Sequence, residues 1–370
     1  MRSSRRSALV SSIALLVILV SALASGGTGA APAPNDPLAA DLDHWLTVTQ
    51  SRPDSDPLWA HLKETREPKL ERAREDLRGG WRLAALQGLS MARPELAAAV
   101  YLNERPAGER NDMAAFEAAW KQTGEALRDD LGAPSPARFE GLPAFVRALS
   151  EATFPQVRAY YQASLDYAHN TTPGDGFLYL GAALARRDLV EFFRTLPASA
   201  PRRTTPPLRS IRPELDALED ELHSVYRPPV SIDRHREFIL ASATLKEARE
   251  LDAAGLRYGA LLRYLQAAQQ IALLRPAAPA PLAPGTLDRR LRELAARLSA
   301  KGVDHGIGQL FLETARSEAA RSAPGTVSPE AASLVEDVLP RYFAALEPAR
   351  PQPPRPEPQV TVTLVRWPYT

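Results

Sequence analysis

The chain has 370 residues, with 45 lysines and arginines against 44 aspartates and glutamates, and it contains no cysteine. Without the three arginines Arg2, Arg5 and Arg6, 42 basic residues face 44 acidic ones. This balance excludes the strongly basic surface by which many proteins bind nucleic acids or anionic membranes, so no nucleic-acid partner is predicted. The lack of cysteine excludes disulfides, thiolate metal sites and a cysteine nucleophile.

The N-terminus has the layout of a secretory signal. The three arginines precede an uncharged, apolar run over 8–24, which ends in the small-residue motif Ala22-Leu23-Ala24 before Ser25. This pattern predicts a signal peptide over 1–24 followed by a flexible segment over 25–35. The mature protein is then periplasmic or secreted. The alternative is an inner-membrane anchor formed by an uncleaved 8–24, because this run is at the low end of the length that spans a bilayer.

Proline divides the rest of the chain. Three short stretches, at 197–213, 276–284 and 348–358, hold 15 of the 34 prolines, and such density prevents regular helix or sheet. The predicted organisation is therefore two helical blocks, two linkers and a tail. The blocks span 36–196 and 214–346, the linkers 197–213 and 347–359, and the tail 360–370.

Helical periodicity and capping residues fill both blocks. Asp36, Asp56 and Ser328 each stand directly before a proline, which is typical of a helix N-terminus. Apolar residues recur at steps of three and four along four further segments. These predict helices over 113–131 with a cap at Asn111 or Asp112, over 177–196 after a turn at 173–176, over 215–225, and over 287–298 with a cap at Thr286. Asp304 is expected to cap the helix that follows it.

Two segments carry the same pattern of small residues around a glycine. In 244–275 a glycine is followed by small, aromatic and small residues, and 69–96 repeats these offsets. The pattern resembles the tetratricopeptide repeat, in which small side chains let two antiparallel helices approach closely. The resemblance implies an all-α fold of antiparallel helical hairpins, arranged as a solenoid; an irregular helical bundle is the alternative. The residues expected to pack these hairpins are Gly80, Ala85, Leu89, Ala92, Gly255, Ala260, Tyr264 and Ala267.

The C-terminal tail breaks the helical pattern. Apolar and polar residues alternate there with β-branched enrichment, which predicts a short strand. The strand either lies against the protein's own helices or adds to the sheet edge of a partner. The candidate partner-binding residues are Val360, Val362, Leu364, Trp367 and Tyr369.

The sequence contains no recognisable catalytic or metal-binding constellation. Its six histidines are scattered, with no pair spaced to place two imidazoles on one helix face, so no metal and no cofactor are predicted. Four acids crowd one helix at 216–221, where a solvated face is the simple interpretation and acid–base chemistry the alternative. The tyrosines Tyr160, Tyr161, Tyr167 and Tyr179 belong either to the core or to a ligand groove.

These observations predict an exported, non-catalytic binding or scaffold protein of the bacterial envelope, whose partner is another protein or a peptide. Two alternatives stay open. One is an α-helical enzyme that acts on cell-wall or polysaccharide substrates through Asp or Glu. The other is a structural envelope protein that contacts the membrane only through 8–24.

Overall fold

The computed structural model describes residues 36–196, 204–228, 230–275, 283–299 and 302–347. Within these ranges the fold is all-α, as the sequence predicts, and the β-type contact there is a single parallel bridge between Thr204 and Val303. None of the helices described is both long and apolar enough to span a bilayer. The predicted signal peptide and the predicted strand at 360–370, with its five candidate partner-binding residues, lie outside the described residues.

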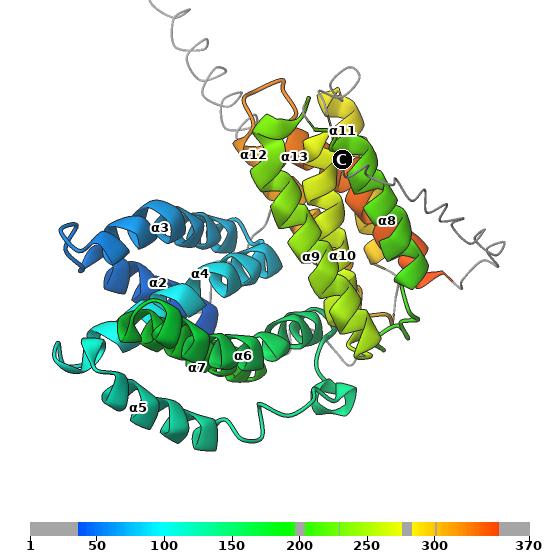
Figure 1. Ribbon diagram of the computed structural model, residues 1–370. Helices are drawn as coiled ribbons and strands as arrows, with labels where there is room; N and C mark the ends of the chain where they lie inside the picture. Colours follow the sequence, from blue (N-terminus) through cyan, green and yellow to red (C-terminus); the bar gives the residue numbers. More distant parts are fainter. Residues whose placement is uncertain (1–35, 197–203, 229, 276–282, 300–301, 348–370) are drawn as a thin grey trace, which may run out of the picture.

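The N-terminal set of helices precedes the first proline-rich stretch (Figure 1). Its members are α2 (Pro37–Gln50), α3 (Pro57–Arg78), α4 (Arg82–Asn103), α5 (Met113–Ala126), α6 (Ala144–Asn170) and α7 (Pro173–Thr195), with short 3-10 helices η1 (Glu109–Asn111) and η2 (Pro136–Phe139). Helices α6 and α7 pack along each other, as do α3 and α4, and α4 also packs on α7. Helix α5 lies on the outer side of α6 and α7.

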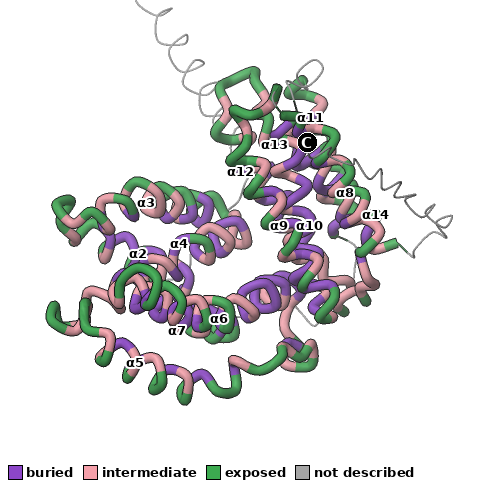
Figure 2. Tube along the Cα trace, viewed as in Figure 1, coloured by how far each residue is buried: buried purple, intermediate pink, exposed green. Residues whose placement is uncertain are grey.

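The C-terminal set is built around α10. It comprises α8 (Arg212–Val225), η3 (Ile232–Arg234), α9 (His235–Ala253), α10 (Arg257–Leu274), α11 (Pro284–Leu298), α12 (Gly306–Arg321), α13 (Pro329–Ser333), the π-helical η4 (Leu334–Val338) and α14 (Leu339–Leu346). Helix α10 packs against α9, α8, α13, η4 and α14, and most of its residues are buried (Figure 2).

The predicted N-terminal caps at the Asp-Pro and Ser-Pro pairs are confirmed. Asp36, Asp56 and Ser328 accept hydrogen bonds from backbone N–H groups in the first turns of α2, α3 and α13. Each cap satisfies a donor that has no partner within its helix, and the proline after it has no N–H to satisfy. Asp112 caps α5 in the same way, and Asp304 accepts a hydrogen bond from the N–H of Gly306 at the start of α12.

Three predicted boundaries are wrong. Helix α5 ends at Ala126 rather than at 131, because Leu127 reaches the core from a turn and thereby continues the apolar spacing beyond the helix. The segment 173–176 is the first turn of α7 rather than a separate turn: its proline occupies the first helical position and Thr172 is the cap. Thr286 does not cap α11, which starts at Pro284.

One prediction about stability arises at the cap of α2. Arg82 of α4 donates hydrogen bonds to the buried carboxylate of Asp36, which holds the pKa of Asp36 below its ordinary value of 3.8. The stabilisation is therefore complete above that value and is lost as the pH falls through the lowered pKa. We expect Asp36→Asn to cost about 2 kcal/mol at pH 7. In urea unfolding the difference from wild type should shrink below pH 4; a constant difference down to pH 2 would contradict this.

The two sets of helices share one large hydrophobic core. Its buried side chains run from Leu38 in α2 to Ala345 in α14, and a smaller cluster lies among α5, α6 and α7. Helix α6 packs against α10, and α12 packs against α4 and α6. The proline-rich stretch between the sets thus joins parts that are packed together, and its described end is held by hydrogen bonds of Thr204 with Gly302 and Asp304.

Two buried acids, Glu151 and Glu313, and the half-buried Asp304 accept hydrogen bonds from the starts of helices in the other set. Glu151 of α6, which has no exposed surface, accepts hydrogen bonds of 2.9 Å from the N–H groups of Tyr258 and Gly259 at the start of α10. In the opposite direction, Glu313 of α12 accepts from the N–H groups at the start of α4, and Asp304 accepts from the first N–H of α6. A carboxylate at a helix N-terminus is favoured both by hydrogen bonding and by the helix dipole.

Candidate functional site

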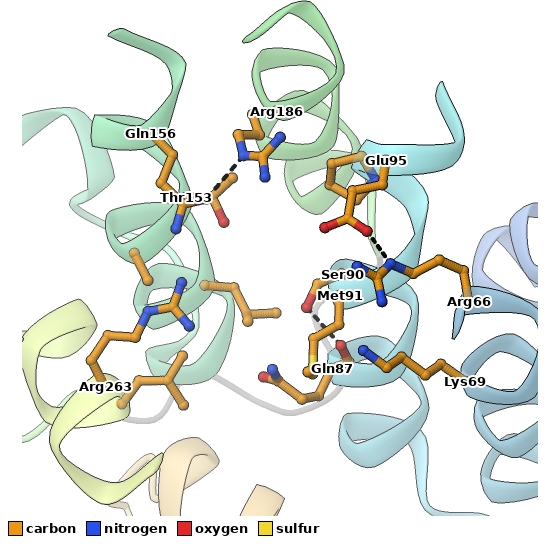
Figure 3. Close-up of a pocket in the computed structure, with 14 residues that line it drawn as sticks. Arg66, Lys69, Gln87, Ser90, Met91, Glu95, Thr153, Gln156, Arg186 and Arg263 are labelled. Atoms are coloured by element: carbon orange, nitrogen blue, oxygen red, sulfur yellow. Dashed lines mark hydrogen bonds and ion pairs between the residues drawn. The ribbon is translucent and has the colours of Figure 1, made fainter. Parts of the chain in front are cut away.

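A groove lies where the two helical sets meet. It consists of two adjoining pockets, of about 220 Å³ and 360 Å³. The first, here called the cationic pocket, lies among α3, α4, α6, α7 and the start of α10 (Figure 3). The second, the outer pocket, lies between α6 and α9. Ala152, Gln156 and Arg186 line both pockets, so these residues form the boundary between them.

A proline within a helix lines each of the two pockets. Pro94 within α4 lines the cationic pocket, and Pro155 within α6 lines the outer one. A proline inside a helix has no N–H to donate, so each of these helices lacks one backbone hydrogen bond beside the groove. On α10, Gly259 lies so close to α6 that a Cβ atom there would be 2.9 Å from the backbone nitrogen of Ala152. This close crossing brings the next turn of α10 against the cationic pocket.

The lining of the cationic pocket is strongly positive. Four cationic side chains and one carboxylate surround it: Arg66, Lys69, Arg186, Arg263 and Glu95. Arg66 pairs with Glu95 across the pocket wall, and Arg263 pairs with Glu247 of α9 at 3.0 Å. Lys69 and Arg186 form no ion pair with any described residue. The pocket therefore carries an uncompensated positive charge.

Arg186 is the most buried of these cations, with 6% of its surface exposed. Its Nε donates to Oε1 of Gln156 at 3.0 Å, and one terminal nitrogen donates to the carbonyl oxygen of Ala182 at 3.1 Å. The guanidinium also lies over the ring of Tyr160, 3.6 Å from the ring centroid. Its second terminal nitrogen, Nη2, donates to no described residue, so part of the hydrogen-bonding capacity of the group is unused.

Burial disfavours the charged forms of both unpaired cations. It lowers the pKa of Arg186 and, together with the nearby Arg66, the pKa of Lys69. The pocket also contains a buried acceptor, Oε1 of Gln87, which accepts no hydrogen bond from the described residues and would need a donor from a ligand or from water. The pocket thus combines unpaired positive charge with an unused donor on Arg186, which is an arrangement for holding an anionic group.

The outer pocket has a different character. Most of its lining is apolar or aromatic, from Pro134, Pro155, Ala159, Tyr160, Leu251, Ala254 and Leu256. Two acids of α9, Glu247 and Glu250, lie at its edge. Glu250 is exposed, and Lys246 approaches it only to 3.9 Å. The groove is therefore cationic at one end, and apolar with an acidic edge at the other.

The eight residues predicted to pack helical hairpins lie on two helix pairs. Gly80 and Gly255 have φ values of +80° and +77° in the short turns between α3 and α4 and between α9 and α10. These conformations favour glycine. The other six side chains are buried with at most 3% exposure: Ala85, Leu89 and Ala92 on α4, and Ala260, Tyr264 and Ala267 on α10. They lie in the core, outside the groove lining.

The histidines and the clustered acids do not gather into a site in the described part of the chain. No group of three or more potential metal ligands occurs there. Asp216 and Glu219 of α8 bind Arg249 of α9, while Glu221 binds arginines of α10's end and α14. These acids therefore tie α8 to its neighbours, so the simple prediction of a solvated face is incomplete. His235 contacts the hydroxyl of Tyr226 at 2.8 Å.

The tyrosines divide between core and groove. Tyr161 is buried and stacks on Trp120, with ring centroids 4.8 Å apart. Tyr167, Tyr179 and Tyr160 stack in sequence, with centroids 3.9 and 5.6 Å apart, and Arg186 extends this stack. Of these four tyrosines, only Tyr160 lines the groove formed by the two pockets.

The central residues of the groove were not among those predicted. Arg186 follows Ala183 by three residues and precedes Val190 and Phe193 by four and seven, so it lies on the apolar stripe of α7. A charged residue on such a stripe is the signal that points to it. Lys69 and Gln156 carry no comparable signal. Comparisons with protein-family models, curated proteins and solved structures give no match for this chain.

Proposed function

We propose that the protein is an exported, non-catalytic binding protein of the bacterial envelope, which holds a segment of a protein or peptide partner in the groove between its helical sets. The observation that supports this most is the meeting of two unlike pockets at Arg186. A groove with a cationic end and an apolar, acid-edged end favours a ligand with a defined direction, as a peptide segment has. Export is inferred from the signal-like pattern over 1–24.

The buried acids support binding rather than catalysis. Glu151, Asp252 and Glu313 each accept hydrogen bonds from backbone N–H groups at helix starts. These carboxylates therefore stabilise the fold. A pair of carboxylates for glycoside hydrolysis would instead flank a substrate cleft. Nothing in the groove favours the enzymatic alternative over binding.

The hairpin interpretation belongs to the same proposal. We infer that α3–α4 and α9–α10 are antiparallel hairpins similar to tetratricopeptide repeats. The glycines in their turns and the small buried residues on α4 and α10 support this. Stacked hairpins expose extended surfaces suited to partners. A second contact with a partner, through the tail 360–370, is part of the proposal; truncation after Glu347 should then weaken partner recovery without abolishing binding in the groove.

Site-specific photocrosslinking in the native envelope tests the proposed groove. Met91 lines the cationic pocket and Ile239 lies on α9 away from both pockets, and both are 49% exposed. A photoreactive phenylalanine analogue at position 91 should give a discrete higher-mass adduct, whereas the same analogue at 239 should not. Equal adducts at both positions, or none at position 91, would contradict the proposal.

The predicted export is tested by the intact mass of the protein isolated from its native cell. Cleavage after Ala24 should give a soluble envelope species that starts at Ser25. A full-length mass in the membrane fraction would instead support the anchored alternative.

A further inference from the structure

We propose that the cationic pocket is a binding site for a small oxyanion, a ligand that carries a carboxylate or a phosphate group, and that Arg186 and Lys69 are the residues that neutralise it. This inference adds a chemical class of ligand to the proposed function. It can be tested with a free small anion, without the protein or peptide partner.

Two of the four cations in the pocket wall have no carboxylate partner in the described part of the chain. Of the cations in its wall, Arg66 and Arg263 have carboxylate partners, namely Glu95 and Glu247. Lys69 and Arg186 have none among the described residues, although Glu95 and Glu247 lie near enough to favour the charged form of Arg186. A cation taken out of water without a counter-ion is costly to a folded protein. A bound anion would remove that cost.

The guanidinium of Arg186 is held in place by its neighbours. Gln156 and the carbonyl of Ala182 hold one side of its guanidinium, and Tyr160 supports its face. Tyr160 is itself held by the stack with Tyr179. The group is therefore fixed before a ligand arrives, with Nη2 free to donate. Fixed donors on a planar guanidinium suit carboxylate and phosphate oxygens, and fixing them in advance reduces the entropy lost on binding.

The two pockets are large enough for a small anionic ligand. A volume of about 220 Å³ accommodates a small anion with a few additional atoms. The outer pocket, which shares Arg186, offers an apolar surface for the remainder of such a ligand. Figure 3 shows Arg186, Lys69 and Arg263 on different sides of the cationic pocket, so an anion inside it would be approached by positive charge from several helices.

The test is calorimetric titration of the mature protein, residues 25–370, with sodium phosphate and, separately, with sodium succinate, in low-chloride buffer. At least one anion should bind saturably with a stoichiometry of one, and which of them does identifies the ligand group. Succinamide, which is uncharged and of similar size, should not bind. Binding should weaken as ionic strength rises.

Matched variants connect the binding to the pocket. Arg186→Met should weaken anion binding by about 10- to 100-fold, because it removes a charge-assisted hydrogen bond. Arg187→Met makes the same change one residue away, on a half-buried side chain paired with Asp188, and should leave binding unchanged. Lys69→Met should also weaken binding, whereas Lys121→Met, at an exposed position of α5, should not.

Stability measurements separate a ligand-binding arginine from a structural one. If Arg186 serves a ligand, Arg186→Met should melt close to wild type without the anion, because a methionine fills similar space and no carboxylate is left unpaired. It should also lose the thermal stabilisation that the anion gives wild type. Failure of both anions to bind, or equal binding by the Arg186 and Arg187 variants, would overturn the proposal. If Arg186→Met does not fold, the comparison of Lys69→Met with Lys121→Met tests the proposal in its place, and equal anion binding by these two variants would overturn it.

Discussion

Replacement of Glu151 by alanine is expected to lower the free energy of unfolding by about 3–5 kcal/mol, since it leaves a buried partner charge and two helix N–H groups without an acceptor. Glu151 is wholly buried, and its carboxylate receives the N–H groups of Tyr258 and Gly259 at 2.9 Å and the side chain of Arg147 at 2.7 Å. The variant should also separate α6 from α10, which together enclose part of the groove.

Two controls make the Glu151 result specific. Glu151→Gln keeps an oxygen acceptor of the same size, so it should cost only about 1–2 kcal/mol. Glu250→Ala removes an exposed glutamate of α9 and should change stability by no more than about 0.5 kcal/mol. Urea unfolding followed by circular dichroism measures all three. If Glu151→Ala unfolds at the same urea concentration as Glu250→Ala, then the buried carboxylate does not hold the two helical sets together.

Replacement of Gly259 by alanine should cost about 2 kcal/mol, even though alanine is the better helix former. A Cβ atom at 259 would lie 2.9 Å from the backbone nitrogen of Ala152 and from Cβ of Glu151, distances that require one helix to move. The strain of this overpacking should exceed the gain in helix propensity. Because Leu262 and Arg263 lie one turn further along α10, the same displacement should weaken anion binding in the cationic pocket.

Gly285→Ala provides the matched control for this prediction. Gly285 lies in the first turn of α11 with no atom within 4 Å of a Cβ placed there. Alanine there should be neutral or stabilise the protein by up to about 1 kcal/mol. Thermal melts of the two variants should therefore differ in direction. Equal melting temperatures would mean that the contact between α6 and α10 tolerates an added methyl group.

Local features of the fold could be predicted from the sequence because their causes are local. A capping oxygen before a proline marks the starts of α2, α3 and α13, since both the cap and the missing N–H act within one turn. Apolar spacing likewise indicates α8. The same local reasoning misplaces the end of α5, because Leu127 keeps the helical spacing while it packs from a turn.

Contacts between distant segments could not be predicted in this way. Glu151 and Glu313 look like ordinary surface acids in the sequence, and only the tertiary fold places them at the starts of α10 and α4. The acids at 216–221 are a similar case: their spacing indicates a polar face, but nothing local identifies Arg249 or Arg275 as their partners. A residue far along the chain decides whether such a charge is solvated or bound.

Most residues of the candidate site could not be predicted from the sequence either. The sequence predicts that Tyr160 belongs either to the core or to a groove, and the place of Arg186 on the apolar stripe of α7 is a signal that points to it. Lys69 and Arg66 come from another helix and carry no signal of their own. Five helices contribute residues to this pocket, so its net charge depends on how the helices pack and cannot be predicted from any one segment.

The central claim, that an oxyanion binds at Arg186, is tested most directly by nuclear magnetic resonance of the arginine side chains. The Nε–Hε signal of Arg186 can be assigned by its absence from the spectrum of Arg186→Lys, and that of Arg187 likewise. The proposal predicts that phosphate or succinate shifts the Arg186 signal along a saturable curve and leaves the Arg187 signal in place. An Arg186 signal that does not move, or that moves together with the exposed arginines without saturation, would contradict it.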